Sequence, residues 1–372
     1  MAEHASTGVT ATVVDALSPP SADFADAVHR LLTAFLDAEA ASLTDLDPSL
    51  EVLVAVARQM VLGGGKRLRS VFAFWGWRGA VGPDRPVAPV LPALGALELL
   101  HACALVHDDV MDDSATRRGL PTAHRAVAAR HVALGWPGDP DEFGHHAAIL
   151  IGDLCMVWAD RLAGNAELPA ATLLTAREGY DRMRLEAIAG QFLDLLGNAA
   201  RDPSPVEHAL RVARLKTASY TVVRPLVYGA MLGGATGDGT LARAYTRYGL
   251  AVGEAFQLRD DLLGVYGDPH VTGKPVGEDL LRGRSTVLVE LARASATGTE
   301  ATELRALLAR RSPEDLPRLA ALLARTGAVT QLNRMIAERV AHAFAAVNDG
   351  PLDPQTREGL CRLATAASQR SS

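Results

Sequence analysis

The sequence has few cysteines and few aromatic residues, and each shortage excludes a class of protein. Its three cysteines, Cys103, Cys155 and Cys361, lie far apart, so they predict neither a disulfide framework nor a zinc site with closely spaced cysteines. Aromatic residues make up only 5% of the chain, whereas hydrophobic residues make up 48%, with alanine and leucine dominant. Both are strong helix formers, and few runs alternate polar and apolar residues as strands do. We therefore expect an all-α protein with a sizeable core.

The sequence also lacks an excess of basic residues, an apolar N-terminal leader and an uninterrupted apolar span. The chain has 37 basic and 43 acidic residues and a net charge of -6, so we expect no nucleic-acid partner. The first 20 residues lack the basic start and apolar core of a signal peptide, and with the isolated cysteines this predicts a cytoplasmic protein. The richest apolar run, Val90–Val106, is interrupted by Glu98 and His101. It therefore predicts a buried helix rather than a membrane span.

The chain shows no internal repeat and no boundary between two cores. Residues 1–20 are small and polar and predict a disordered tail, whereas residues 21–368 predict a single all-α domain. The turn-rich stretch 135–144 predicts an exposed insertion. Apolar periodicity predicts helices over Ser21–Ala41, Leu50–Leu62, Val71–Trp77, His124–Leu134, His145–Gly164, Pro169–Leu196, Pro205–Thr217, Ser219–Gly233 and Gly239–Val265.

The most informative stretch is Leu97–Arg118, in which an apolar helix ends in four aspartates: Asp108, Asp109, Asp112 and Asp113. Residues three and four apart share a helical face, so carboxylates gather on one side and repel one another unless a cation lies between them. Such hard oxygen ligands suit Mg²⁺, which binds through one or two carboxylates plus substrate phosphates. Arg117 and Arg118 follow at once, and their forked donors match phosphate oxygens. The stretch therefore predicts metal-bridged diphosphate chemistry.

A second acidic pair, Asp260 and Asp261, also follows an apolar helical run, with Gln257 one turn earlier. Alone, this pair would fit a solvated helix end equally well. Together with the first cluster, it predicts two acidic helix ends that close on one metal cluster at the mouth of a helical bundle.

The basic segment Gly63–Arg69 has the sequence GGGKRLR. It is not a P-loop, because Met60 and Arg67 stand where that motif needs glycine and Ser or Thr. A flexible turn with three cations at a helix start predicts an anion site instead. Other polar residues, each unremarkable alone, support such a site only as a group: His101, Gln191, Asp194, Lys216, Thr217, Lys274 and Arg284.

Taken in order, these segments resemble the trans-isoprenyl diphosphate synthases of the polyprenyl synthetase family, and most of all a bacterial geranylgeranyl diphosphate synthase. GGGKRLR resembles the family's GGKRxRP, with Ser70 in place of proline, and LVHDDVMD resembles its DDxxD motif. Further blocks between about residues 60 and 290 are RRGLPTAH, AGQFLDL, LKTASY, FQLRDD and GKPVGEDLLRGRST. In two departures, Gly264 replaces the third aspartate of the second motif and Arg284 replaces a lysine.

The resemblance implies a single helical bundle around a deep central cavity, a homodimer, and Mg²⁺-dependent head-to-tail condensation of isopentenyl diphosphate with an allylic diphosphate. It also assigns roles to individual residues. Asp108, Asp112 and Asp260 would be metal ligands, and Asp109 and Asp261 would orient the metal shell. Arg117, Lys216 and Lys274 would hold the allylic diphosphate; Lys66, Arg69, His101 and Arg118 would hold isopentenyl diphosphate; and Thr217 and Gln257 would lie near the carbocation.

Product length should depend on the residues that precede the first aspartate motif. Cys103 and Ala104 are small, and Leu100 offers the next obstacle, one helical turn lower. This predicts geranylgeranyl diphosphate, with farnesyl or longer polyprenyl diphosphates as alternatives.

Two rival functions remain open at this point. A class I terpene cyclase would normally carry an Asn/Ser/Glu triad where this chain has Asp260 and Asp261. A non-catalytic partner subunit would tend to lose its aspartate motifs. A di-iron bundle would need inward Glu-x-x-His pairs, and none is suitably placed in the sequence.

Overall fold

The computed structural model describes residues 21–199, 206–268 and 276–368. Within these ranges the chain is almost entirely helical, and its only strands are the two-residue β1 (Thr116–Arg117) and β2 (Leu120–Pro121), paired antiparallel. The all-α prediction is therefore confirmed. The predicted disordered tail, residues 1–20, lies outside the described residues. No helix in the described ranges is both long enough and apolar enough to cross a membrane.

The chain divides into two compact units, which we describe separately. The N-terminal unit comprises the described residues of Leu17–Phe74 and Asp84–Leu173, and the C-terminal unit those of Trp75–Pro83 and Leu174–Ser372. That residues 21–368 form a single domain stays a prediction.

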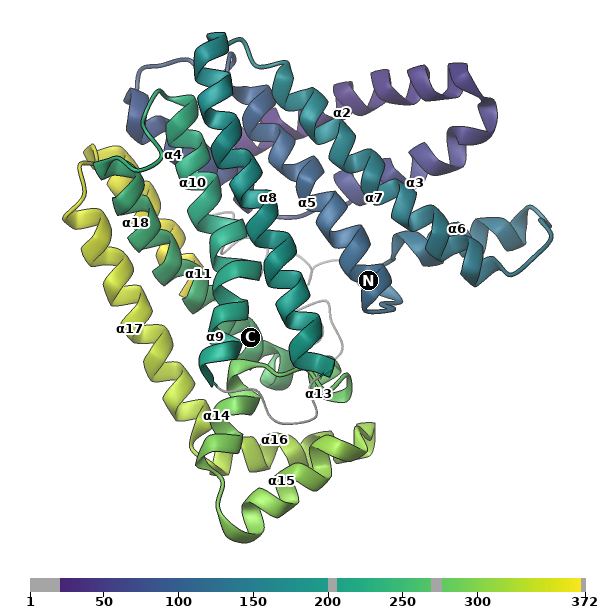
Figure 1. Cartoon of the computed structure of the whole chain (residues 1–372), viewed down its shortest axis with the longest axis vertical. Coiled ribbons are helices and arrows are strands. Elements are labelled where there is room, and N and C mark those ends of the chain that lie inside the picture. The colour runs from purple at the N-terminus through teal and green to yellow at the C-terminus, as the bar shows by residue number, and fades with distance from the viewer. Residues whose placement is uncertain (1–20, 200–205, 269–275, 369–372) are drawn as a thin grey trace, which may run out of the picture. The chain divides into compact units, whose positions relative to one another are not determined.

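The N-terminal unit is built around α5 (Leu91–Met111), which packs against α7 (Pro140–Gly164) (Figure 1). The apolar side chains of α5 are buried around most of its circumference, as the rich apolar run of the sequence predicts. The other elements are α2 (Ser21–Leu46), η1 (Pro48–Leu50), α3 (Glu51–Leu62), the first half of α4 (Leu68–Val81), and α6 (Ala123–Ala133), which also packs on α7.

One sequence prediction in this unit is wrong in part: residues 135–143 are exposed apart from the half-buried Pro140, as predicted, but the second half of the stretch 135–144 is helical rather than turn-rich. α7 begins at Pro140, because the Asp139 side chain accepts a hydrogen bond from the Asp141 N–H at 2.9 Å and caps the helix. A proline at the first helical position needs no hydrogen bond from its own nitrogen. Only the turn before Pro140 is left without helical structure.

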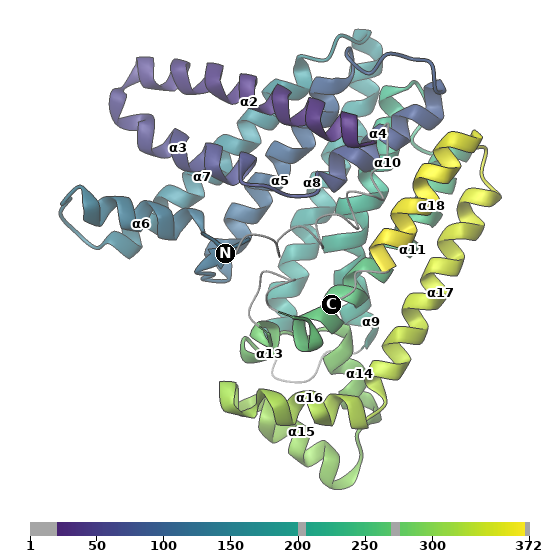
Figure 2. The same ribbon diagram turned by 180° about the vertical axis from the view of Figure 1, so that it is seen from behind.

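The C-terminal unit is built around α11 (Thr240–Tyr266), which packs on α17 (Ala328–Asn348); the two lie side by side in Figure 1 and Figure 2. α8 (Ala170–Ala199) contributes most of its length to this unit. The remaining helices are α9 (Val206–Val212), η2 (Ala213–Val223), α10 (Arg224–Leu232), α13 (Glu278–Leu281), α14 (Val287–Ser295), α15 (Gly298–Arg310), η3 (Pro313–Asp315), α16 (Leu316–Arg325) and α18 (Pro354–Ser368).

The predicted break between helices at residue 218 is also wrong. η2 is a π-helix that joins α9 to α10 without interruption. Two glycines make room for it, because a Cβ on Gly190 would lie 2.5 Å from the Lys216 nitrogen and a Cβ on Gly253 would lie 2.3 Å from the Ala218 Cα. Lys216 and Thr217 therefore lie in a π-helix, a kind of helix that is rare and often found at functional sites.

Candidate active site

The first aspartate cluster forms the C-terminal end of α5. The Asp112 N–H donates to the Asp108 carbonyl oxygen at 2.9 Å, so the two residues lie one helical turn apart on a common face. Both side chains are partly exposed, whereas the Asp109 side chain is only 1% exposed. Of these three carboxylates, those of Asp108 and Asp112 are accessible to solvent and that of Asp109 points inward.

Arg117, on β1, holds the inward carboxylate. Its Nε lies 2.9 Å from both Asp109 carboxylate oxygens, and its Nη2 lies 2.6 Å from Oδ1. The same Nη2 lies 3.5 Å from Asp108 Oδ2. Burial raises the pKa of Asp109, while Arg117 acts in the opposite direction. The guanidinium thus compensates a carboxylate that would otherwise be costly to bury.

The basic segment forms a tight turn before α4. Gly64 and Gly65 have φ angles of 93° and 122°, a region that favours glycine, and the Arg118 guanidinium donates to the Gly64 carbonyl. A Cβ on Gly65 would lie 2.8 Å from that guanidinium. The glycines therefore allow Arg118 to pack directly on the turn. The predicted substrate residues Lys66 and Arg69, both half-buried, lie immediately after it.

A small pocket in the N-terminal unit brings together polar residues of three segments. Its lining includes Arg67, Glu98, His101 and Arg118. Burial, followed by the nearby Arg69 and Arg118, holds the pKa of His101 well below its ordinary value. The Glu98 carboxylate, 3.5 Å from Arg67 Nη1, offsets one of the positive charges, and the remaining guanidinium groups around the imidazole favour a bound anion. Arg67 belongs to the basic segment but was assigned no substrate role from the sequence. The structure adds it to the residues that line this pocket.

Ser70, which replaces the family's proline, has a structural role of its own. Its N–H lies 3.3 Å and its hydroxyl 3.0 Å from Glu98 Oε1, and Arg67 Nη1 lies 3.5 Å from the other oxygen of this buried carboxylate. A proline has no N–H to donate. The serine therefore ties the start of α4 to α5 in a way that proline would not.

In the C-terminal unit, a chain of hydrogen bonds joins three predicted residues. Thr217 Oγ1 donates to Gln257 Oε1 at 2.6 Å, and Gln257 Nε2 donates to Asp261 Oδ1 at 2.9 Å. The Val287 N–H donates to the other Asp261 oxygen at 3.0 Å. Asp261 is buried, and burial raises its pKa to about 7. Asp260, the predicted metal ligand, is only half-buried beside it.

Lys216 lies on the same π-helix as Thr217, and its Nζ donates to Asp194 Oδ2 on α8 at 2.8 Å. Asp194 thus has Lys216 as a partner, a pairing that the sequence did not predict. Lys274, the other predicted ligand of the allylic diphosphate, lies outside the described residues.

The structure also identifies a carboxylate that the sequence analysis missed. A Cβ on Gly264 would lie 3.3 Å from Asp279 Oδ2, and Arg284 Nη1 lies 3.4 Å from Asp279 Oδ1. The side chain of Asp279 therefore stands beside the position where the third aspartate of the second motif is missing. The signal was present within GKPVGEDLLRGRST, but the spacing alone does not predict that the loop folds back onto α11.

The residues predicted to set product length lie on the two turns of α5 before Asp108. Leu100 and Cys103 are buried and Ala104 is half-buried. The Cys103 sulfur lies 3.8 Å from His107 Nδ1, and His107 Nε2 lies 3.0 Å from the Ile149 carbonyl of α7. Cys103 is therefore oriented toward α7, whereas Ala104 is the more accessible of the two small residues.

The carboxylates of each aspartate motif are of a kind that suits a hard divalent cation. Asp108 and Asp112 in the N-terminal unit, and separately Asp260 in the C-terminal unit, offer only carboxylate oxygens, and all three are partly exposed. Mg²⁺ typically takes one or two such carboxylates and completes its shell with water and phosphate oxygens. Bound there, the ion would supply charge neutralisation for a departing diphosphate.

Comparison with known proteins gives a consistent result. Residues 50–325 match the family described as polyprenyl synthetase. The chain is 36% identical over 279 residues to the geranylgeranyl diphosphate synthase of Mycobacterium tuberculosis, which covers 74% of this chain and 72% of that protein. It is 30% identical to the octaprenyl diphosphate synthase of Escherichia coli over 89% of this chain and 94% of that protein.

A solved structure is similar over nearly the whole chain. It is the geranylgeranyl pyrophosphate synthase of Corynebacterium glutamicum, complexed with isoprenyl diphosphate and magnesium. The TM-score is 0.88 at 39% identity, and the match covers 94% of this chain and 99% of that one.

Proposed function

Because the chain belongs to the polyprenyl synthetase family and is a trans-prenyl diphosphate synthase, we propose that its main product is geranylgeranyl diphosphate. Its relatives make products of several lengths, since their names include geranylgeranyl, geranylfarnesyl and octaprenyl diphosphate synthases. Similarity alone therefore leaves the length open. The observation that supports our proposal is the small, half-buried Ala104, one turn before Asp108 on a helix that has no Phe, Tyr or Trp.

The proposed tunnel runs along α5 from the aspartates toward Leu91. Each helical turn rises about 5.4 Å, close to the length of one isoprene unit. Ala104 would let the growing chain pass the first turn, and Leu100 and the residues below it would stop the chain at the length of a geranylgeranyl group. A farnesyl-length product would instead require a bulky side chain at the level of Ala104.

The reaction that we propose begins with Mg²⁺ and an allylic diphosphate. Asp108 and Asp112 of the first motif and Asp260 of the second would hold the metal, and Asp109 and Asp261 would orient its shell. Arg117, Lys216 and Lys274 would neutralise the charge that grows on the departing diphosphate, which lowers the barrier to C–O cleavage.

Isopentenyl diphosphate would bind at the cationic pocket of the N-terminal unit, held by Lys66, Arg69, His101 and Arg118. Its double bond would attack C1 of the allylic cation, and the departing diphosphate would take the final proton. Thr217 and Gln257, already hydrogen-bonded to each other, would face the cation with oxygen dipoles and stabilise its positive charge.

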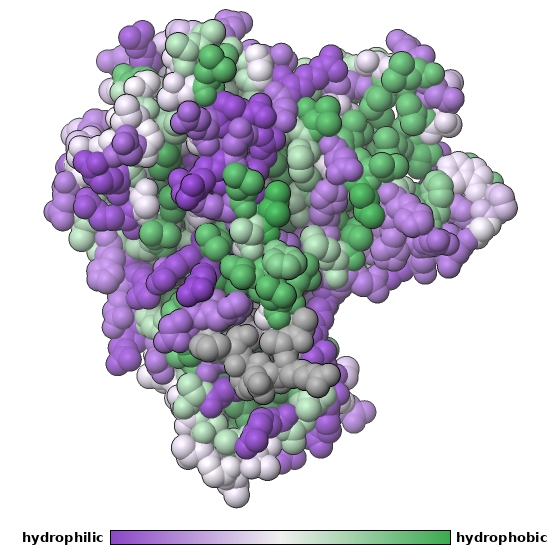
Figure 3. Space-filling model, viewed as in Figure 1, coloured by the Kyte–Doolittle hydropathy of each residue, from purple (hydrophilic) through white to green (hydrophobic). Residues whose placement is uncertain are grey.

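We also propose that the chain is a homodimer. Apolar side chains of α8 remain exposed along one stripe, where Leu185, Ile188 and Phe192 are each at least 60% exposed, and Figure 3 shows hydrophobic side chains gathered over this helix. A stripe of this kind is typical of a subunit interface. Light scattering on the purified chain tests this proposal. We expect the wild type to be a dimer and the Ile188→Asp variant to be a monomer. A monomeric wild-type chain would refute the proposal.

The product is tested with labelled isopentenyl diphosphate, Mg²⁺ and each allylic primer in turn, followed by separation of the products by length. We expect geranylgeranyl diphosphate to accumulate as the end product from every primer that is shorter. Accumulation of farnesyl diphosphate, or of chains beyond geranylgeranyl, would refute the proposed length. Hydrocarbon formed from geranylgeranyl diphosphate alone would favour a cyclase, and a chain inactive without a second protein would favour a partner subunit.

A further inference from the structure

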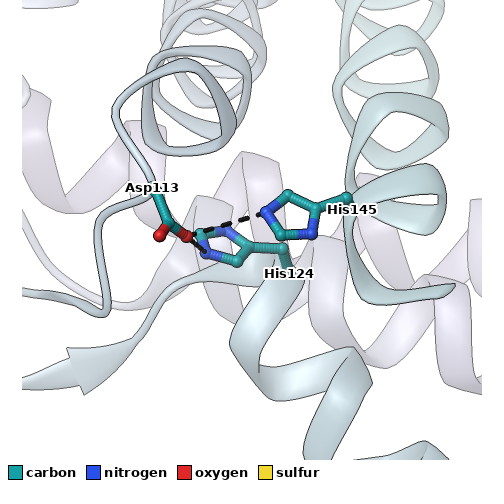
Figure 4. A group of neighbouring side chains, drawn as sticks. All are labelled: Asp113, His124 and His145. Atoms are coloured by element: carbon teal, nitrogen blue, oxygen red, sulfur yellow. Dashed lines mark ion pairs between the residues drawn. The ribbon is translucent and has the colours of Figure 1, made fainter. Parts of the chain in front are cut away.

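A second group of metal-ligating side chains lies in the N-terminal unit, beyond the first aspartate motif. Asp113 follows the end of α5 with a φ of 49°, His124 lies in the first turn of α6, and His145 lies in the second turn of α7. Asp113 Oδ1 lies 3.6 Å from His124 Nε2 and 3.7 Å from His145 Nε2. Figure 4 shows both imidazoles turned toward this one carboxylate.

The hydrogen bonds of His124 determine which ring nitrogen carries its proton. The Thr122 hydroxyl donates its single proton to the Ser114 carbonyl at 2.7 Å, so toward His124 Nδ1, at 3.3 Å, it acts as an acceptor. Nδ1 is therefore the protonated nitrogen, and Nε2 carries a lone pair. The His124 side chain is only 1% exposed, and Nε2 has no hydrogen-bond partner among the described residues.

The same argument holds for His145. Its Nδ1 lies 2.7 Å from the Asp141 carbonyl oxygen, which can only accept, so Nδ1 carries the proton. In the neutral ring, the Nε2 lone pair then faces Asp113 Oδ1, 3.7 Å away. Burial, followed by the neighbouring His145, lowers the pKa of His124.

Two lone pairs that face one carboxylate oxygen repel it unless a cation lies between them. Arg125 is the nearest guanidinium: Nη2 donates to Asp113 Oδ1 and Nη1 to Asp141 Oδ1, each at 2.8 Å. One positive charge cannot balance these two carboxylates. The group therefore retains negative charge, and His124 Nε2 is left without a hydrogen-bond partner among the described residues.

We propose that Asp113, His124 and His145 bind a divalent transition metal of the zinc class. All three ligand atoms lie within 4.8 Å of one another. Zinc bonds of about 2.0–2.2 Å in a tetrahedron place neighbouring ligand atoms about 3.4 Å apart, close to the two His–Asp distances. A ligating imidazole usually donates its other N–H to an outer partner, as His124 does to Thr122 and His145 to Asp141.

This site differs chemically from the proposed magnesium site. Imidazole nitrogen suits zinc, whereas an all-carboxylate set suits magnesium. Asp113 is 66% exposed, so metal can enter from solvent and water can complete the shell. Because the three ligands come from the end of α5, from α6 and from α7, the metal would fix the turn that carries Arg117 and Arg118.

The test uses the full chain, freed of metal and of any histidine tag, in excess Mg²⁺ so that the aspartate motifs are occupied. Zn²⁺ is titrated by calorimetry into the wild type and into His145→Ala, Asp113→Asn and His146→Ala. His146 is the neighbouring exposed histidine outside the group, so its variant is the matched control. We expect one Zn²⁺ per chain for the wild type and His146→Ala, and loss of this binding in the other two.

Co²⁺ gives an independent readout, because a four-coordinate Co²⁺ site absorbs visible light far more strongly than aqueous Co²⁺. We expect this absorption, and a rise in the melting temperature with Zn²⁺, in the wild type and in His146→Ala only. Three results would overturn the proposal: no Zn²⁺ binding by the wild type in excess Mg²⁺, unchanged binding in His145→Ala, or equal loss in His146→Ala. Circular dichroism of each variant confirms that a loss of binding is not a loss of fold.

Discussion

Substitution of Arg117 by methionine tests the description of the first aspartate cluster most directly. The Arg117 side chain is 22% exposed and its partner Asp109 is 1% exposed, so the charge pair is largely out of water. Methionine keeps much of the apolar volume and removes the guanidinium. Asp109 would then be a buried carboxylate without its counter-charge.

Breaking a buried pair from one side costs about 3–5 kcal/mol, because the remaining charge is left uncompensated. That cost corresponds to about two to four powers of ten in the unfolding equilibrium. Bound Mg²⁺ would supply positive charge near the same carboxylate. We therefore expect the loss of stability to be largest in chelator and smaller in Mg²⁺.

The assay is urea denaturation followed by tryptophan fluorescence, to which the buried Trp158 of the same unit contributes. Arg125→Met is the matched control, since Arg125 pairs with the exposed Asp113 and Asp141. Removal of an exposed pair changes stability by about 0–1 kcal/mol. If Arg117→Met were no more destabilising in chelator than Arg125→Met, the account of Asp109 would be wrong.

Three further positions give predictions with defined outcomes. Ala104→Phe should shorten the main product to farnesyl diphosphate, whereas Ala104→Ser should leave the product unchanged. Both outcomes are measured by separating the labelled products by length. If the product lengths of the phenylalanine variant were unaltered, α5 would not be the wall of the tunnel. Ser70→Pro should destabilise the protein by about 1–3 kcal/mol through loss of the donors to the buried Glu98, measured by urea denaturation. Asp279→Asn should lower kcat and raise the Mg²⁺ concentration for half-maximal rate, because its carboxylate stands beside Gly264; an unchanged Mg²⁺ dependence would leave Asp279 without a role.

Much of the fold follows from local patterns. The long apolar run of α5 and the helical periodicity of α7 and α11 predicted these helices, because burial of an apolar face is a property of the sequence itself. The π-helix could not be predicted in this way. Its wide turn depends on the contacts of Gly190 and Gly253 with it, and neither glycine is near it in sequence.

The candidate site shows the same distinction between features that local sequence predicts and features that depend on tertiary contacts. Ordered motifs identified the aspartates and the basic turn, since helical spacing fixes which side chains share a face. The roles of Arg67, Asp279 and the Asp113 group depend on contacts between segments that are distant in sequence or joined by loops. Such contacts are set by tertiary packing, which spacing along the chain does not encode.

Gly253, which packs against the π-helix, limits which amino-acid substitutions this enzyme can accept. Gly253 carries no chemical group, yet any side chain there would press against the backbone of Ala218, next to Thr217. The displaced segment would carry the Thr217 hydroxyl away from Gln257 and, through it, loosen the hold on Asp261. A residue with no side-chain donor or acceptor can thus control whether Thr217, Gln257 and Asp261 remain aligned.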